Sequence, residues 1–289
     1  MTHPSLVGTF RGEVLKVSRQ LSVWLMLLGA LVMFGVIVLA TTSADNIHTL
    51  AAKDRTGFAY NMLDIFGTVF QIGSGIFLLL VGSRLIAMEY SSGTIRIIYA
   101  RGTGRLALLL AKMGTLLLMG LLLLVAYLVI VGVVLSLLVG SWTGGIAPLQ
   151  HLPQSFWQDF WRWVLVQGIS IGVLILMAAA AAAIGRSLAF AMAASLAFFP
   201  VDNFLTIILA LAARATRHDH PWTDISAYLL GPNINVLLNL LEPAHLSRAA
   251  FATPLVKVDA THSLLVIGAF AAAFAIVAVL RTVRPDVLE

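Results

Sequence analysis

Hydrophobic residues along the chain gather in six long runs that short polar connections separate. A helix of about 20 apolar residues crosses a hydrocarbon core about 30 Å thick, and each run is long enough to do so. The predicted spans are 21–41, 63–87, 107–138, 162–184, 187–211 and 262–281. Because lipid offers no hydrogen-bond partners to the backbone, these runs are expected to be helical. The pattern predicts an all-α integral membrane protein with six transmembrane helices.

The segment before the first run has a helical period of its own. Apolar residues step by three and four at Val7, Phe10, Val14, Val17 and Leu21. Basic residues occupy the other faces, which favours residues 1–20 as an amphipathic helix lying in the cytoplasmic interface. The alternative is a solvated tail. The run at 21–41 is too long for the hydrophobic region of a secretory signal, so we expect it to be retained as a span.

Residues 21–289 form one six-span domain with two notable connections. The aromatic residues near 140–161 are typical of an interfacial belt. The longest connection, about 212–261, contains an apolar stretch at 225–241 that is too short to span a membrane and that Gly231-Pro232 interrupts. We therefore expect a re-entrant or surface helical segment before the last span.

The composition is that of a membrane protein, and it excludes several candidate functions. Hydrophobic residues make up 60% and charged residues 11% of the 289 residues, whereas soluble domains carry about a quarter charged residues. There is no cysteine, which excludes disulfides, thiolate nucleophiles and cysteine metal sites. The net charge of +5 indicates membrane orientation rather than binding of nucleic acid.

The distribution of charge predicts which ends of the spans face the cytoplasm. Basic residues outnumber acidic ones at the N-terminus, the 84–112 connection, the 185–187 turn and the C-terminus. These basic residues are Arg11, Lys16, Arg19, Arg84, Arg96, Arg101, Arg105, Lys112, Arg186, Arg281 and Arg284. The opposite connections carry more acids than bases. By the positive-inside rule, both termini and the 84–112 connection lie in the cytoplasm of a multi-pass protein of the cell (plasma or inner) membrane.

The 84–112 connection is a polar segment that contains several glycines and lies between two apolar runs. We call it the island. It carries Glu89, Gly93, Thr94 and Arg96, followed by Arg101, Arg105 and Lys112. The residues 91–94 favour a turn or a helix cap, and the apolar residues after them favour a short amphipathic helix at the membrane surface. The alternative is a basic loop held by anionic lipid headgroups.

This island resembles the cytoplasmic loop after the second span of ABC-2 type permease subunits. The shared pattern is a Glu, a Gly-Thr pair, an aliphatic and a basic residue, an Arg and, seven residues on, a Lys that opens the third span. Here these are Glu89, Gly93-Thr94, Ile95-Arg96, Arg105 and Lys112. The N-terminal segment, the six-span layout and the last long loop, with Tyr228 and Pro232-Asn233, are similar as well. The loop departs from the family at 101–104, where Arg-Gly-Thr-Gly replaces a proline-containing turn.

The resemblance implies a type V exporter. Two six-span permeases, identical or homologous, would lie side by side, each docked on one of two ABC ATP-binding subunits. A coupling segment at about 88–106 would contact the ATPase through Glu89, Gly93, Thr94, Arg96, Arg101 and Arg105. The implied substrate is hydrophobic or amphipathic: a drug, a lipid or a peptide.

Catalytic and metal-binding motifs are missing from the sequence. There is no GxxxxGK[ST] phosphate loop, so Mg-ATP is expected on the partner ATPase and this chain is not expected to be an enzyme by itself. His218-Asp219-His220 alone is a weak metal signal. We therefore expect no cofactor and no metal on this chain.

A few polar residues fall inside the apolar runs. Asp202 and Asn203 follow Pro200 in the fifth run, and Gln71 lies in the second. A charge at membrane depth costs about 3 kcal/mol on insertion scales, so Asp202 is expected to face protein or water. Gln71, Asp202 and Asn203 are candidates for the translocation path or its gate. The alternative for Asp202 is that it satisfies backbone groups freed at Pro200. The alternative for Gln71 is a role in close helix packing.

Two other functions fit a polytopic chain. An ion- or proton-coupled secondary transporter would act without an ATPase, but it favours repeated halves and several midplane acids, and this sequence has one such acid. A membrane enzyme acting on lipid would need a cluster of acids or histidines that the sequence does not offer. An ATP-driven permease therefore fits best.

Overall fold

The structure, a computed structural model, describes residues 5–43, 47, 50, 51, 53–100, 102–145, 147–241 and 252–283. Helices dominate it, and these residues contain no strand. Six helices are long and apolar enough to cross a membrane. They are α2 (Leu21–Thr42), α4 (Arg55–Ser91), α6 (Arg105–Thr143), α8 (Gln154–Gly185), α9 (Leu188–Thr216) and α12 (Ala260–Val283). The predicted fold class and all six spans are confirmed.

The long helices extend well beyond the predicted spans. α4 has 37 residues and α6 has 39. At 1.5 Å per residue each measures about 55–60 Å, nearly twice the thickness of a hydrocarbon core. The sequence pattern predicted only the apolar part of each helix, whereas the helices continue into the polar residues beside it. One such end is stabilised by Asp54, which accepts a hydrogen bond from the Gly57 amide (2.8 Å) as an N-cap does.

Small residues bring the central helices close together. The run Ala178–Ala183 on α8 is buried throughout, where α8 packs against α4, α9 and α12. A Cβ on Gly82 would lie 3.0 Å from the Ala178 Cβ, so these two helices touch almost backbone to backbone. Ser83 donates to the Ala191 carbonyl (3.1 Å) and ties α4 to α9. This is the close packing that small residues permit in membranes.

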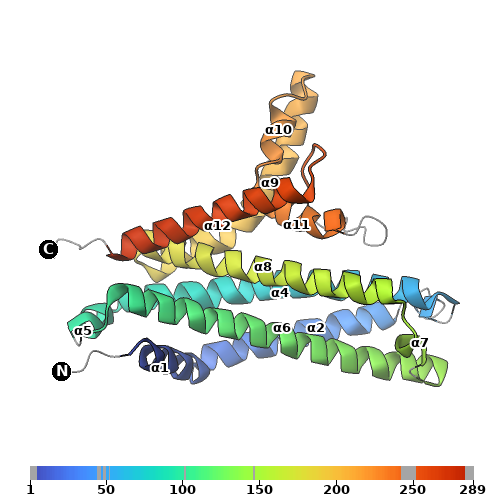
Figure 1. Cartoon of the computed structure of the whole chain (residues 1–289), viewed down its shortest axis with the longest axis horizontal. Helices are drawn as coiled ribbons and strands as arrows, with labels where there is room; N and C mark the ends of the chain where they lie inside the picture. Colours follow the sequence, from blue (N-terminus) through green and yellow to red (C-terminus); the bar gives the residue numbers. More distant parts are fainter. Residues whose placement is uncertain are drawn as a thin grey trace.

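The shorter helices mark the two ends of the bundle. They are α1 (Leu6–Ser18), α5 (Thr94–Ala100), α7 (Ala147–Gln150), α10 (Trp222–Ser226) and α11 (Leu230–Leu241). Figure 1 shows α1, α5 and the carboxyl end of α12 at one end of the bundle and α7 at the other. The charged island therefore lies beside the N-terminal helix. Which end faces the cytoplasm stays a prediction.

Two short helices precede the last span. The expected interruption at Gly231-Pro232 instead lies in the first turn of α11, where a proline costs no helical hydrogen bond. Most of α11 is buried against α8, α9 and α12. It is therefore a packed part of the bundle and does not lie on its surface.

The aromatic group at the start of α8 divides into two sets. Trp157 and Trp161 are 46% and 63% exposed, as expected of rings in an interfacial belt. Phe156 and Trp163 are buried, because they lie on the face of α8 that packs on α4. The predicted belt is therefore limited to the outward-facing rings, and it stays a prediction for them.

Candidate functional site

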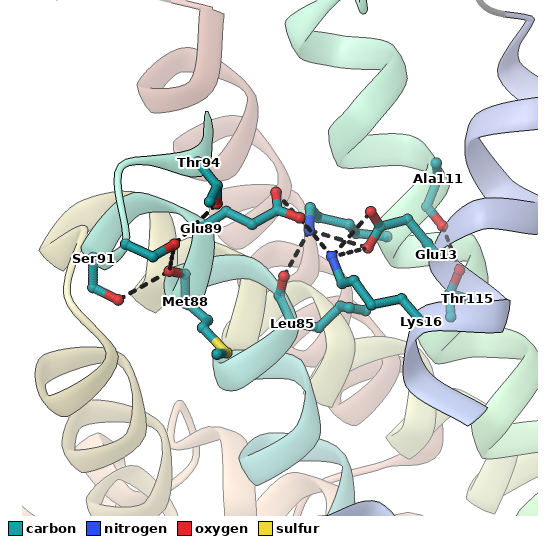
Figure 2. Close-up of polar contacts among 11 residues, drawn as sticks. Glu13, Lys16, Leu85, Met88, Glu89, Ser91, Thr94, Ala111 and Thr115 are labelled. Carbon is teal, nitrogen blue, oxygen red and sulfur yellow. Dashed lines mark hydrogen bonds and ion pairs between the residues drawn. The ribbon is translucent and has the colours of Figure 1, made fainter. Parts of the chain in front are cut away.

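Four charged side chains from three helices meet beside α5. Glu13 and Lys16 come from α1, Glu89 comes from the last turn of α4, and Lys112 comes from the second turn of α6. Figure 2 shows Lys16 between Glu13 and Glu89, with Thr94, the first residue of α5, on the far side of Glu89. We call this group the charge cluster.

Each lysine in the charge cluster contacts both carboxylates. Lys16 Nζ lies 2.9 Å from Glu13 Oε2 and 2.5 Å from Glu89 Oε1. Lys112 Nζ lies 3.1 Å from Glu13 Oε2 and 2.9 Å from Glu89 Oε2. The last contact is an ion pair. Lys112 also donates to the Leu85 carbonyl (2.7 Å).

The charge cluster is buried and electrically balanced. Glu13, Glu89 and Lys112 are at most 7% exposed. Burial of a charge is costly unless it is paired and hydrogen-bonded, and two acids facing two lysines meet that requirement. Burial lowers the pKa of Lys16, but its hydrogen bonds to Glu89 and Glu13 outweigh this and leave the pKa above its ordinary value. Lys16 therefore stays charged and holds α1 against the end of α4.

Local sequence explains how the four side chains converge. Glu13 and Lys16 are three residues apart and share one face of α1, which begins where Ser5 accepts a hydrogen bond from the Gly8 amide (3.1 Å). Lys112 lies seven residues after Arg105, two turns along α6. α1 packs along α6, and α4 packs on α6. The charged ends of three helices therefore meet at one point.

The short helix α5 stands outside the charge cluster. Gly93 has a φ of 69°, a left-handed conformation that favours glycine, and it turns the chain from α4 into α5. Ser92 and Thr94 share a hydrogen bond (2.9 Å) at this turn. Arg96 and Ile97 are exposed. α5 thus offers a mixed basic and apolar surface to anything that approaches this end of the bundle.

The far side of α5 rests on the start of α6. The Arg105 guanidinium lies over the Tyr99 ring, 5.3 Å from its centroid, as in a cation–π contact. Burial, together with the neighbouring Tyr90, raises the pKa of the Tyr99 hydroxyl. Tyr99 therefore stays a neutral, packed ring that supports α5 from beneath.

The predicted contact residues do not all share one surface. Gly93, Thr94 and Arg96 are exposed on or beside α5, and Arg105 is half-exposed. Glu89 instead points inward, with 10% of its side chain exposed and both lysines as partners. Arg101 lies outside the described residues.

Sequence reasoning missed Glu13 as a functional residue and treated Lys16 only as surface charge. A usable signal was present, because Glu13 lies three residues after Phe10 and four before Val17. It therefore falls within the apolar stripe of the amphipathic helix. A carboxylate on that stripe needs a cationic partner when the helix docks.

A second polar group links α4, α9 and α11. Gln71 donates to the Asn235 side chain (3.2 Å), and Asn235 donates to Asn203 (3.1 Å). Asp202, one residue earlier on α9, accepts a hydrogen bond from the backbone amide of Gly231. The three residues predicted for the path or its gate, Gln71, Asp202 and Asn203, are thus brought together around α11.

The arrangement of Asp202 explains a charge within an apolar helix. Its carboxylate is buried at the amino end of α11, where unpaired amides and the helix dipole favour an anion. α9 runs through Pro200 without ending. Asn235, which joins the other two amides, lies outside the residues singled out from sequence, because Gln71 and Asn203 are distant from it along the chain.

These features define a polytopic helical membrane protein with a short amphipathic helix mounted at one end on a buried charge cluster. A family model described as ABC-2 family transporter protein matches residues 9–211. The chain therefore belongs to the ABC-2 transporter family. The match includes the whole charge cluster and α5, and it ends within α9. A comparison with curated proteins finds no match.

Proposed function

We propose that this chain is the permease subunit of an ATP-driven ABC-2 exporter and that α5 is the helix on which a separate ATP-binding subunit docks. Family membership supports an ABC-type permease. The observation that carries the docking role is the exposed Thr94, Arg96 and Ile97 on a helix fixed at the end of the bundle. Mg-ATP would bind the partner, since the chain has no phosphate loop.

The charge cluster supplies a route for movement in this proposal. When two ATPase subunits close on ATP, each would push on α5. Because α5 follows Glu89 and precedes Lys112, a push on α5 moves the ends of α4 and α6 together. The same two residues bind Glu13 and Lys16, so α1 moves with them. Chemistry in one subunit thereby moves an interface in another.

The proposed path lies between two permeases, identical or homologous. The outer faces of α2 and α9 would contact the neighbouring permease or lipid. Four of their apolar side chains are more than half exposed: Leu28, Leu31, Phe204 and Ile208. The polar group around α11 is the proposed gate, since it joins α4 to α9. The proposed substrate is a hydrophobic or amphipathic drug, lipid or peptide.

Cross-linking from α5 tests the docking role. The natural chain has no cysteine, so Ile97→Cys gives a single reactive position on the exposed face of α5. In membranes of the host, we expect it to cross-link to an ABC ATPase that also co-purifies with the chain. Ser155→Cys, exposed at the start of α8 near the opposite end, is the matched control and should not cross-link.

The proposal fails if neither variant captures an ATPase and the purified chain alone moves substrate under a proton gradient. That result would favour the secondary transporter. A cross-link from Ser155→Cys alone would place the docking surface at the wrong end of the bundle.

A further inference from the structure

The amphipathic helix α1 packs on the bundle through most of the apolar stripe that its sequence contains. Val17 in that stripe is 2% exposed. Phe10 lies against α6, where a Cβ on Gly114 would be 3.4 Å from the Phe10 ring. Glu13, on the same face, enters the charge cluster. Protein therefore covers this face of α1, and the opposite face is the one left exposed.

The exposed face of α1 carries a row of four side chains. Val7, Arg11, Leu15 and Arg19 follow one another at intervals of four residues, so they lie along one side of the helix. Val7 and Leu15 are 60% and 52% exposed, and both arginines are exposed. We call these four residues the outer row. Apolar side chains alternate in it with basic ones, a composition suited to the boundary between hydrocarbon and headgroups.

The positive charge of the outer row is not balanced by its own helix. Glu13 is the only acid among residues 1–20, and it is buried against Lys16 and Lys112. Within the described part of the chain, neither Arg11 nor Arg19 forms an ion pair. The outer row therefore presents two positive charges to its surroundings.

Two spans place α1 at the edge of the hydrocarbon core. α2 has 22 residues and no charged side chain, and its length of about 33 Å matches a core of about 30 Å. Leu21, its first residue, therefore lies near the edge of the core, and α1 ends just before it at Ser18. On α6, Lys112 is the last charged residue, and α1 contacts α6 there and at Gly114. α1 therefore lies at the level of the lipid headgroups.

Trp24 agrees with this level. Its side chain is 58% exposed in the first turn of α2. Its indole donates to the Ser18 carbonyl (2.7 Å), which fixes the ring beside the joint between α1 and α2. Exposed tryptophans gather where hydrocarbon meets headgroups. The ring and the outer row thus lie at the same boundary.

We propose that the outer row binds anionic phospholipids, with Arg11 and Arg19 donating to their phosphate groups and Val7 and Leu15 resting on their acyl chains. A guanidinium matches two phosphate oxygens with parallel hydrogen bonds. The net negative charge of such a lipid balances the arginines, whereas a zwitterionic lipid has none to offer. A soluble protein suits the row less well, because at this level it would have to displace headgroups. The contact needs neither ATP nor a partner ATPase, so it is independent of the proposed function.

Quenching of a local fluorophore measures which lipid meets the outer row. The chain has no cysteine, so Gly12→Cys gives a single site for bimane beside the row, where an added Cβ meets no atom within 4 Å. The labelled full chain is reconstituted into equimolar phosphatidylglycerol and phosphatidylcholine, and only one of the two lipids carries bromine near the carboxyl end of its chains. One basic residue near an anionic surface raises binding about fivefold, so quenching by brominated phosphatidylglycerol should exceed that by brominated phosphatidylcholine about threefold or more.

Leu28→Cys on α2 is the matched control site. Leu28 is 56% exposed and lies about two turns into α2, away from the arginines. Bimane at this position should therefore be quenched equally by the two brominated lipids.

Substitution of the two arginines isolates their charge. Arg11→Gln with Arg19→Gln should bring the quenching ratio at Gly12→Cys to about one, and salt at about 1 M should act in the same direction by screening exposed charges. Arg11→Lys with Arg19→Lys keeps both charges and should retain most of the preference. Arg214→Gln with Arg217→Gln removes two exposed charges at the end of α9 and should leave the ratio unchanged.

Three results would overturn the proposal. A ratio near one in the protein that carries both arginines would exclude preference for anionic lipid. Weak quenching by both lipids would show that the outer row faces water or a protein. A ratio that stays high in Arg11→Gln with Arg19→Gln would exclude the arginines from the contact. An unchanged thermal midpoint reports that this variant is folded, and the salt arm needs no substitution of the arginines.

Discussion

At the scale of single residues, charge balance inside the charge cluster decides how α1 is held. Glu89 was expected to face a partner protein, yet its carboxylate lies between Lys16 and Lys112. The sequence places Glu89 in the charged segment where α4 ends and α5 begins. It did not reveal the direction of the side chain, because both lysines come from helices whose packing depends on the whole fold.

Removal of one lysine should expose the cost of an unbalanced cluster. Lys112→Met leaves two buried carboxylates with one cation, and the loss of one partner of a buried ion pair typically costs about 3–5 kcal/mol. We expect a clear drop in the thermal midpoint of the protein in detergent.

The charge-balanced double variant is the control for this drop. Glu89→Gln with Lys112→Met leaves Glu13 paired with Lys16 and should recover much of the loss. An unchanged midpoint for Lys112→Met alone would show that the charge cluster does not stabilise the fold.

The loop after α9 offers a test of pH dependence. His220 Nδ1 lies 2.5 Å from Asp224 Oδ2, and this hydrogen bond, with the charge of Asp224, raises the pKa of His220 above its ordinary 6.5. A raised histidine pKa stabilises the charged contact below pH about 6.5, and the contact is lost as pH rises through the folded-state pKa.

Asp224→Asn should therefore lower the pKa of His220 toward 6.5, as followed by NMR titration of histidine-labelled protein in nanodiscs. A His220 titration that is the same in both proteins would contradict the contact.

At the scale of elements, the proposed function gives α5 and the charge cluster separable roles. Arg96 is exposed on α5, whereas Glu89 is buried beneath it. One exposed surface and one buried support therefore lie within the same short segment. Sequence spacing alone grouped them together, since they are only seven residues apart.

Alanine substitutions should separate these two roles. Arg96→Ala should weaken ATPase binding by about tenfold or more, as for the loss of a charged hydrogen bond, and leave the thermal midpoint unchanged. Glu89→Ala should lower both ATPase binding and the thermal midpoint, because it removes a carboxylate that pairs with two lysines. Arg11→Ala, exposed on α1, is the basic control. Equal effects of Arg96→Ala and Glu89→Ala on the thermal midpoint would contradict separate roles for the two residues.

Asp202 allows a test of the packing of α11. Asp202→Asn keeps a hydrogen-bond acceptor but removes the anion at the amino end of the helix, a contribution of up to about 2 kcal/mol. We expect insertion of all six spans to continue and amide hydrogen exchange at Gly231 and at Asn233–Asn235 to increase. Asn239→Asp, later on the same helix, is the control, because it adds a negative charge whereas Asp202→Asn removes one. Unchanged amide exchange would show that the Asp202 carboxylate does not stabilise α11.

At the scale of the whole molecule, the apolar pattern predicted the all-α class and the six spans because each span satisfies its own backbone hydrogen bonds. The charge cluster and the amide chain through Asn235 were not predictable in this way. Their partners lie up to 164 residues apart, and only the assembled bundle brings them together.

The orientation of the bundle in the membrane can be checked with single cysteines. Thr94→Cys lies beside the turn into α5 and Ser155→Cys lies near the opposite end. In intact cells, a membrane-impermeant thiol reagent should label Ser155→Cys and spare Thr94→Cys until the cells are opened. The reverse pattern would place α5 outside the cell.

The charge cluster also sets an order of events during synthesis. Glu13 and Lys112 are separated by 99 residues, and a ribosome adds about 5–20 residues per second. For roughly 5–20 s, therefore, Glu13 of the newly made N-terminal helix has Lys16 as a partner but not yet Lys112. Docking of this helix is a late step of biogenesis, and nascent chains arrested before the third span should keep this helix open to protease.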